Sequence, residues 1–412
     1  MISRRIAIQT AAVLAAAAAS GSRNALAADK VVKVGVNLSF TGADAENAAR
    51  IGNGAVIAFE EANAAKAVPG YTFQLVKLDD ATATAGQYDP AQAATNARTM
   101  VSDKAYMAAL GPQMSGAGKA MAPILSQGNL AIITPASTNP DLTDPKFAQQ
   151  YRPAGKAIYF RTVATDAYQG PNMANYMMDT LKVKSVFVLD DSGAYGVGIA
   201  DSFQAQAEKR GIKVLGRDRL DPKAADYAPI LTKIKSLGPQ GLYYGGVSQA
   251  GVKLAKQAYE IIPDVIKAGG DGMQTVDLLK GAGFPAVEGW YATVASPHVI
   301  EDPISAKFSD RYFARFKQHP DDYTITCYTG AQVIIEAVKR AAASGKPVTR
   351  DAVRDAIQGV KLPNSMLGPI EFDENGDLRN KIISVFQIRK NAEQPLDDPT
   401  AQYKYVGVAP VA

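Results

Sequence analysis

The chain has 412 residues, of which 47% are hydrophobic and 20% are charged, a globular composition whose length suggests roughly two domains. Its 44 Lys and Arg residues nearly balance 40 Asp and Glu residues. A near-neutral chain without basic runs argues against nucleic acid as the main partner, because phosphate contacts need clustered cations. One cysteine, Cys327, and two histidines are too few for the usual ligand sets of zinc or iron–sulfur sites. We therefore expect neither a metal nor a cofactor.

The first 27 residues have the features of an export signal. Arg4-Arg5 precedes an apolar, alanine-rich stretch at 6–20, and Ala25-Leu26-Ala27 supplies the small residues that signal peptidase needs. The stretch is short for a membrane span of about 20 residues, and Arg23 interrupts its far end. We predict cleavage before Ala28 and a soluble protein in the periplasm. The paired arginines are similar to a twin-arginine motif, so both the Sec and the Tat route stay open.

Past residue 30, segments rich in β-branched residues alternate with segments of helical spacing. The first strand covers 31–38, and hydrophobic residues at three- and four-residue intervals then predict a helix at 48–65. This first block continues with strands at 73–78, 107–110 and 131–134 and helices at 90–101 and 118–126. Strands that alternate with helices of this length predict βαβ units and a parallel sheet covered on both faces.

The same alternation restarts after Asp166. It predicts helices at 170–180, 197–210 and 227–236 and strands at 185–189, 213–220 and 241–244. Beyond these lie predicted helices at 248–260, 305–318, 328–343 and 349–359, a segment at 290–295 and a closing strand at 382–387. The chain is thus predicted to be an α/β protein with two Rossmann-like lobes, each large enough for its own core. In such sheets ligands bind at the carboxyl ends of the parallel strands.

A glycine-rich loop at 111–118 follows a strand and opens a helix, which is the position of a phosphate-binding loop. It lacks the lysine of a P-loop, because Ala117 stands there, and it fails the dinucleotide pattern at Met121. The Ser115 hydroxyl and the backbone N–H groups of the helix N-terminus remain, and together they suit a carboxylate. An ordinary serine cap with a glycine-rich turn is the alternative.

A second loop at 134–140 also follows a strand and carries small hydroxyl residues, including Ser137 and Thr138, between two prolines. A rigid loop with donors and acceptors suits a zwitterionic ligand. The plainer interpretation is a turn that uses proline for its fixed φ and asparagine for its side-chain bond to the backbone.

The sequence Gly246-Val247-Ser248-Gln249-Ala250 approximates a nucleophile elbow between a strand and a helix, which makes a serine esterase the enzyme alternative. Its fifth position is alanine, and only His298 or His319 could act as the base. Ser248 is equally suited to cap a helix. We therefore expect a binding protein rather than an enzyme.

Several short motifs, in one order over nearly the whole chain after residue 28, resemble the leucine/isoleucine/valine-binding family of periplasmic solute receptors for ABC importers. They are Leu78-Asp79-Asp80-Ala81, 111–115, 133–143, Arg161-Thr162, Gln169-Gly170-Pro171, Tyr195-Gly196, Tyr243-Tyr244-Gly245-Gly246, Glu288-Gly289 and 368–377. Each motif is weak alone, but their order is specific. The resemblance implies a type I periplasmic-binding-protein fold, in which two lobes with parallel-rich sheets are joined by a hinge of three crossings.

We predict these crossings near 161–164, 290–295 and 376–379. The first lobe then comprises 28–163 and 292–378, and the second comprises 164–291 and 379–412. We expect a monomer that closes on a small carboxylate-bearing solute and delivers it to an ABC permease in the inner membrane. A ligand-sensing domain of the same fold would need a membrane-spanning or signalling extension, which we do not expect here.

The resemblance also implies how an amino-acid ligand is held. In the family a serine at the place of Ser115 and a threonine at the place of Thr138 bind the carboxylate. The ammonium group meets the carbonyl at the place of Ala136, the hydroxyl at the place of Thr138 and an acid that aligns with Asp271. Neutral donors suit a carboxylate, and one fixed acid balances one ammonium group.

Two aromatic residues complete this implied site. A second-lobe tyrosine of the family corresponds to Tyr195, and an aromatic residue that precedes a late helix corresponds to Tyr323.

The pocket for the ligand side chain departs from the family pattern. Asn47 stands where branched-chain receptors often carry an aromatic residue, with Asp44 nearby, and Val247 stands where a tyrosine is common. The family's first-lobe cysteine pair is missing, and Met114 lies at or near one of its places. These changes predict a wider and more polar pocket. We expect an amino acid, branched-chain or related, with aromatic or other non-amino carboxylates as the alternative.

Overall fold

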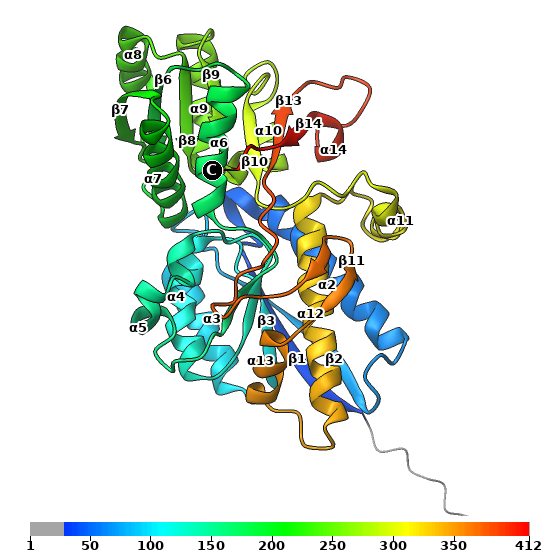
Figure 1. Ribbon diagram of the computed structural model, residues 1–412. Helices are drawn as coiled ribbons and strands as arrows, with labels where there is room; N and C mark the ends of the chain where they lie inside the picture. The colour runs from blue at the N-terminus through cyan, green and yellow to red at the C-terminus, as the bar shows by residue number, and fades with distance from the viewer. Residues whose placement is uncertain (1–28, 412) are drawn as a thin grey trace, which may run out of the picture.

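The described residues, 29–411, form two α/β lobes in the computed structural model (Figure 1). The export signal predicted at 1–27 lies outside this range. One lobe contains a five-stranded sheet and the other a seven-stranded sheet, and a two-stranded hairpin accompanies the first lobe. The predicted fold class, two lobes with parallel-rich sheets, is confirmed.

The first lobe is built on a parallel sheet in the order β2-β1-β3-β4-β5. Its strands are β1 (Lys30–Leu38), β2 (Tyr71–Asp79), β3 (Tyr106–Leu110), β4 (Ile132–Thr134) and β5 (Tyr159–Arg161). Its helices are η1 (Gly42–Asp44), α2 (Ala45–Ala64), α3 (Pro90–Ser102), α4 (Ser115–Gln127), η2 (Pro140–Leu142), η3 (Pro145–Phe147) and α5 (Ala148–Tyr151). Later segments join it: α11 (Pro303–Phe316), α12 (Asp322–Ala343), α13 (Arg350–Gln358) and the hairpin β11 (Leu362–Ser365) and β12 (Gly368–Ile370).

The second lobe has a sheet in the order β14-β13-β10-β9-β8-β6-β7, parallel except where β13 pairs with β10 and β14. The strands are β6 (Ser185–Asp190), β7 (Lys213–Arg219), β8 (Gly241–Gly245), β9 (Ile266–Gly269), β10 (Tyr291–Val294), β13 (Ser384–Ile388) and β14 (Tyr403–Val408). The helices are α6 (Asp166–Asp179), α7 (Ala194–Lys209), α8 (Ala228–Leu237), α9 (Ser248–Ile261), η4 (Asp271–Met273), α10 (Val276–Ala282) and α14 (Pro399–Gln402).

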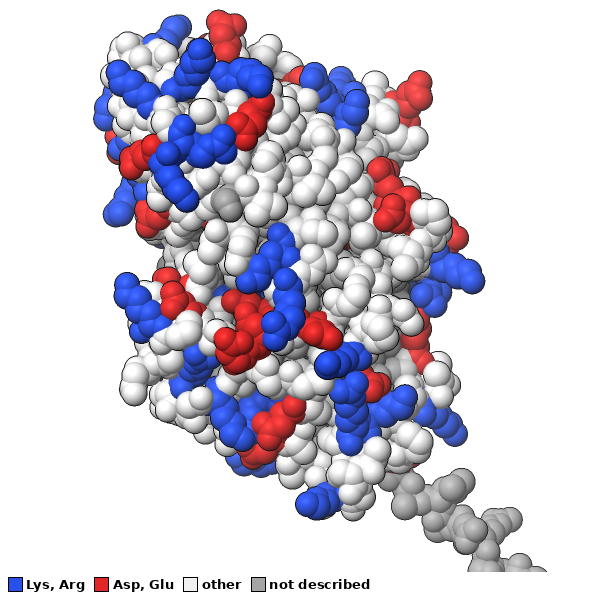
Figure 2. All heavy atoms as spheres, in the orientation of Figure 1, with Lys and Arg blue, Asp and Glu red and all other residues white. Residues whose placement is uncertain are grey.

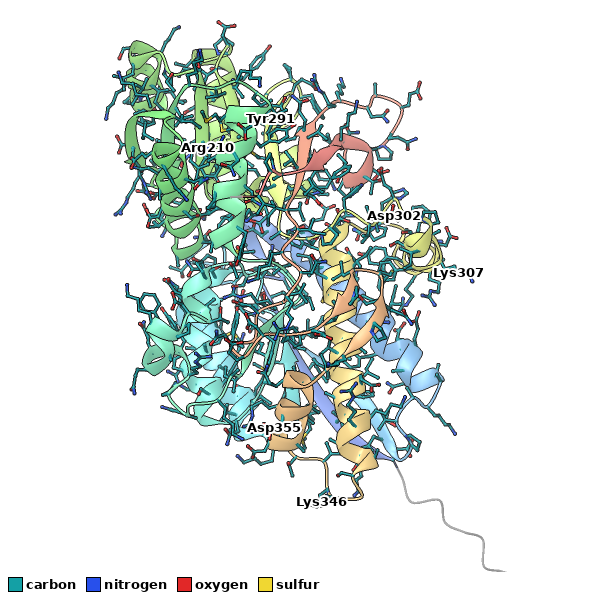
Figure 3. All side chains as sticks on the ribbon, in the orientation of Figure 1. Arg210, Tyr291, Asp302, Lys307, Lys346 and Asp355 are labelled. Atoms are coloured by element: carbon teal, nitrogen blue, oxygen red, sulfur yellow. The ribbon has the colours of Figure 1, made fainter. Side chains whose placement is uncertain are left out.

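One predicted lobe boundary falls inside a strand. β10 pairs with both neighbours in the seven-stranded sheet, through Tyr291 with Ala268 of β9 and Val294 with Ser384 of β13. Figure 3 labels Tyr291 within this second lobe. Since the boundary predicted between residues 291 and 292 cuts β10, we place it after Val294 instead.

The start of α12 also differs from the prediction. The helix begins at Asp322, six residues before the predicted start at 328. Residues 322–327 are rich in β-branched side chains, which favour helices weakly and hide the helix in the sequence pattern. A capping box stabilises this first turn: the Asp321 carboxylate accepts from the Thr324 N–H at 2.8 Å, and the Thr324 hydroxyl accepts from the Asp321 N–H at 3.1 Å. The extra turn places Tyr323 between the lobes.

Three crossings connect the lobes, after β5, after β10 and before β13. They are tied to one another by backbone hydrogen bonds. The Ala164 N–H donates to the Ala295 carbonyl at 2.8 Å, and the Arg161 N–H donates to the Gly376 carbonyl at 3.1 Å. The crossings therefore run side by side, as a hinge requires.

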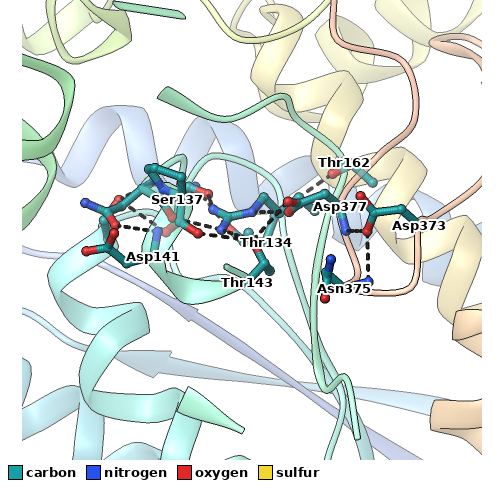
Figure 4. A network of polar contacts seen from close by, with 12 residues as sticks. Thr134, Ser137, Asp141, Thr143, Thr162, Asp373, Asn375 and Asp377 are labelled. Carbon is teal, nitrogen blue, oxygen red and sulfur yellow. Dashed lines mark hydrogen bonds and ion pairs between the residues drawn. The ribbon is translucent and has the colours of Figure 1, made fainter. Parts of the chain in front are cut away.

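The buried guanidinium of Arg161 fixes the place where the first and third crossings meet. Figure 4 shows the surrounding network, with Thr143 beside Asp377. Its Nε donates to Asp377 Oδ1 at 2.7 Å, and its two Nη atoms donate to the carbonyls of Ser137 and Asn139 at 2.7 and 2.8 Å. The Thr143 hydroxyl accepts from Nη2 at 2.9 Å and donates to Asp377 Oδ2 at 3.0 Å. One cation thus holds the loop after β4 against the third crossing.

His298 ties the second crossing to α12. Its Nδ1 lies 2.8 Å from Asp322 Oδ2, its Nε2 lies 3.1 Å from Glu301 Oε2, and its ring stacks on Tyr405 with centroids 4.6 Å apart. Burial lowers the pKa of His298, but the two carboxylates outweigh burial and raise the pKa to about 9 from an ordinary 6.5. A pKa raised by folding stabilises the protein fully below pH 6.5, and this contribution is lost as the pH rises through 9.

We expect the melting temperature of the wild type to exceed that of His298→Gln most clearly at pH 6, and the gap to shrink by pH 9.5, as the ring loses its proton. Thermal unfolding across this pH range measures the gap. His319→Gln, which changes a side chain that is 44% exposed, is the control and should follow the wild type. A gap that stays constant with pH would contradict a charged His298.

Both signs of charge mix over the surface that Figure 2 shows, with Lys and Arg gathering over α6 to α8 of the second lobe. Near the middle of this face, Lys and Arg side chains stand beside a group of Asp and Glu side chains.

Candidate ligand-binding site

A cavity lies between the two lobes and encloses about 410 Å³ of space not filled by atoms, its opening to solvent included. The first lobe lines it with Asp44, Asn47, Ile51, Gln113, Met114, Ser115, Ala136 and Tyr323. The second lobe contributes Tyr195, Val247, Asp271, Gly272 and Thr275.

Eight of the ten residues predicted for the site line this cavity: Asn47, Met114, Ser115, Ala136, Tyr195, Val247, Asp271 and Tyr323. Ser137 and Thr138 do not, although both are buried. The loop turns because the Thr134 hydroxyl accepts from the Ser137 N–H at 2.8 Å, and the Ser137 hydroxyl then donates to Ser115 Oγ at 3.3 Å. Ser137 therefore positions Ser115 instead of forming the wall.

Ser115 is the first residue of α4, whose N-cap is Met114. Its Oγ accepts from the Asn139 N–H at 3.2 Å, which holds the hydroxyl in place. The turn that leads to the helix passes Gly111, whose φ is +105° and whose position leaves no room for a Cβ, because that atom would overlap the Asn37 carbonyl. The free N–H groups of the first helical turn carry a partial positive charge. This end of the cavity therefore offers donors to an anionic group.

Asp271 provides a carboxylate, which can accept hydrogen bonds from a cationic group. It opens η4 directly after β9 and is 7% exposed. Its carboxylate accepts hydrogen bonds from the hydroxyls of Tyr195 and Tyr323 and, at 3.1 Å, from Gln169 Nε2. Burial raises the pKa of Asp271, and these hydrogen bonds partly oppose the rise. Because Tyr323 comes from the other lobe, this carboxylate also joins the two lobes.

A second buried acid, Asp166, stands behind Asp271 and was not predicted as a site residue. Gln169 bridges the two, donating also to Asp166 Oδ1 at 2.9 Å. Burial and the neighbouring charge of Asp271 raise the pKa of Asp166 to about 8. Among the described residues that line the cavity, there is no Lys, Arg or His. The region around Asp271 thus favours a cationic group from a ligand.

The structure gives no support to catalysis by Ser248. Its hydroxyl is buried and shares a hydrogen bond of 2.7 Å with the Thr275 hydroxyl. His298 is engaged with two carboxylates, and His319 lies near Asp398, so neither histidine bonds to Ser248. The serine is the first residue of α9, after the N-cap Val247.

Within residues 29–411, no group of three or more His, Cys, Asp or Glu side chains is placed to hold a metal ion. In the same range, no helix is both long and apolar enough to cross a membrane.

The chain matches the family model described as "Periplasmic binding protein" over residues 31–393 and belongs to that family. It is 29% identical to Leu/Ile/Val-binding protein homolog 3 of Brucella melitensis over 374 residues, which cover 91% of this chain and 95% of that protein. It is 28% identical to the leucine-, isoleucine-, valine-, threonine-, and alanine-binding protein of Pseudomonas aeruginosa, covering 92% and 96%. The structure of a leucine binding protein, LivK, from Thermotoga maritima is similar with a TM-score of 0.78, 25% identity and coverage of 92% and 98%.

These similarities confirm the family that the sequence motifs predicted. The chain is a periplasmic binding protein, a solute receptor and not an enzyme. The esterase alternative is therefore not favoured.

Proposed function

We propose that the interlobe cavity binds one α-amino acid in zwitterionic form, for delivery to an ABC permease. The observation that carries this proposal is the pairing of opposite chemistries in one cavity: Ser115 with the N-terminus of α4 on one side, and the buried carboxylate of Asp271 on the other. A zwitterion matches this pair group by group.

In this proposal the ligand carboxylate accepts from the Ser115 hydroxyl and the first N–H groups of α4. The ligand ammonium group donates to Asp271 and to the Ala136 carbonyl. Tyr195 and Tyr323 hold Asp271 in position, since both hydroxyls already donate to it. An ammonium group beside Asp271 would lower the raised pKa of that carboxyl, and this electrostatic gain would appear as affinity.

Contacts between the lobes support closure around the ligand. Asn139 Nδ2 donates to the Ala194 carbonyl at 2.9 Å, and Gln249 Nε2 donates to the Ala85 carbonyl at 3.2 Å. Release of the solute requires these contacts to break as the hinge opens. We further propose that the receptor acts as a monomer and is exported by its first 27 residues, through the Sec or the Tat route.

Ser115→Ala should weaken amino-acid binding by about 1.5–3 kcal/mol, because it removes a donor from a charged group in a buried site. Titration calorimetry with a panel of α-amino acids measures the change. Ser248→Ala is the matched control: it also removes the hydroxyl of a buried serine at the start of a helix, but Ser248 does not line the cavity. Equal affinities of Ser115→Ala and the wild type would contradict the binding of the ligand carboxylate by Ser115. Failure of every amino acid to bind the wild type would contradict the proposal as a whole.

A further inference from the structure

Three polar side chains of the first lobe line the cavity without a hydrogen-bond partner among the described residues. They are Asp44, Asn47 and Gln113, whose exposures are 1%, 4% and 8%. One oxygen of each is fully buried and unpaired: Asp44 Oδ2, Asn47 Oδ1 and Gln113 Oε1. Buried acceptors are normally satisfied, and leaving one unpaired costs free energy. Each of these oxygens can therefore accept a hydrogen bond from a ligand in the cavity.

The three side chains do not belong to the groups assigned to the zwitterion. Asp271 interacts with Tyr195, Tyr323 and Gln169, whereas the charges that act on Asp44 are those of Asp277, Asp191 and Asp80. Asn47 also lies beside Asp277, since its backbone N–H donates to Asp277 Oδ2 at 3.0 Å. The cavity wall thus has two separate acids, Asp271 and Asp44.

We propose that the solute is an amino acid whose side chain ends in an N–H donor, and that this donor binds Asp44, with Asn47 and Gln113 as neighbouring partners. This inference rests on the proposed function, because Ser115 and Asp271 must already hold the α-carboxylate and α-ammonium groups. The donor is an amide or ureido group if the side chain is neutral, and an ammonium or guanidinium group if it is charged.

An aliphatic side chain fits this wall poorly. It would cover three acceptors without bonding to any, and it would remove water from a carboxylate that has no cation beside it. Ile51, Met114 and Val247 supply apolar surface in the same cavity, which suits the methylene stem of a longer side chain. Burial, followed by the charges of Asp277, Asp191 and Asp80, raises the pKa of Asp44 to about 7, as expected for an acid that lacks a donor.

The test is titration calorimetry with five α-amino acids: leucine, glutamine, citrulline, ornithine and arginine. For the wild type we expect at least one ligand with a terminal N–H donor to bind at least tenfold more tightly than leucine. Asp44→Asn should weaken a charged ligand by at least tenfold and leave leucine within about twofold, because it removes the charge and keeps the shape. A loss of affinity confined to ornithine and arginine identifies a charged ligand side chain. A small and similar loss of affinity for all four ligands with an N–H donor identifies a neutral one.

Two further variants make the result independent of folding defects. Asn47→Leu has a similar volume and should shift selectivity towards leucine by at least fivefold. Asp310→Asn, an exposed acid on α11, is the control and should change no affinity. Leucine binding as tightly as all four donors, or an equal change for all five ligands in Asp44→Asn, would overturn the inference while the proposed function stands. Binding of none of the five would overturn the inference, and the proposed function falls with it if no other α-amino acid binds the wild type.

Discussion

Replacing Asp271 by asparagine should weaken the binding of α-amino acids by roughly 2–5 kcal/mol, or about 30- to 5,000-fold. The carboxylate is buried and has no basic side chain beside it in the described cavity wall, so a ligand ammonium group would be its only cation there. The Asp271→Asn substitution keeps the size of the side chain but leaves the desolvated ammonium without its counter-ion.

The substitution would also disturb the hydrogen bonds within the site. Tyr195, Tyr323 and Gln169 all donate to Asp271. An asparagine has one acceptor oxygen in place of two, so its NH₂ group would face a donor. This second effect adds to the first for every ligand, because it loosens the closed cavity.

A pair of ligands separates the two effects. Leucine and 4-methylpentanoate share the carboxylate and the aliphatic chain and differ only in the amine. Calorimetry on wild type and Asp271→Asn should show a much larger loss for leucine than for its deamino counterpart, with Asp310→Asn as the surface control. Equal losses for the two ligands would mean that Asp271 supports the closed state and does not bind an amine.

The sequence predicted the features that depend on local pattern. Alternation of β-branched strands with helices indicated both lobes, and the glycine-rich loop indicated Ser115 at a helix start, where the structure has it. Asp271 had no such local signal, because one acid in a glycine-rich turn is typical of many loops. It was predicted only through the order of family motifs, which reflects the whole fold.

Features that depend on long-range contacts were not predictable from local pattern. The sequence indicates Gln169 only as part of a motif and does not indicate Asp166 as a site residue, yet the fold places both behind an acid more than a hundred residues away. The first turn of α12 was hidden by β-branched residues, whose weak helix preference is overcome by capping and burial. The strand β14 has one buried residue among its six, so it shows little of the alternation that indicates a half-buried strand.

The loop after β4 shows a second limit of what the sequence can predict about the site. Its hydroxyl residues predicted contacts with a ligand, but Ser137 and Thr138 lie outside the cavity wall. The direction of a side chain in a loop depends on the hydrogen bonds of its neighbours, here those of Thr134 and Arg161. Ser137 therefore acts on a ligand indirectly, through the position of Ser115, whereas Ala136 of the same loop lines the cavity.

Arg161→Met should lower the free energy of unfolding by about 3–5 kcal/mol, because it removes one partner of a largely buried, hydrogen-bonded ion pair. The methionine keeps much of the apolar stem but leaves Asp377 without its cation and the carbonyls of Ser137 and Asn139 without their donor. Denaturant unfolding of the apo protein measures the loss.

Arg152→Met is the matched control, since Arg152 also contacts the third crossing but by one hydrogen bond of 2.8 Å to Asn375 and from a more exposed position. It should cost less than about 1 kcal/mol, as for an exposed polar contact. Because Arg161 also fixes the loop that positions Ser115, its variant should bind amino acids more weakly even at temperatures where it is fully folded. A stability loss no larger than that of Arg152→Met would mean that the crossings are held by their backbone hydrogen bonds, and that Arg161 contributes little to the hinge.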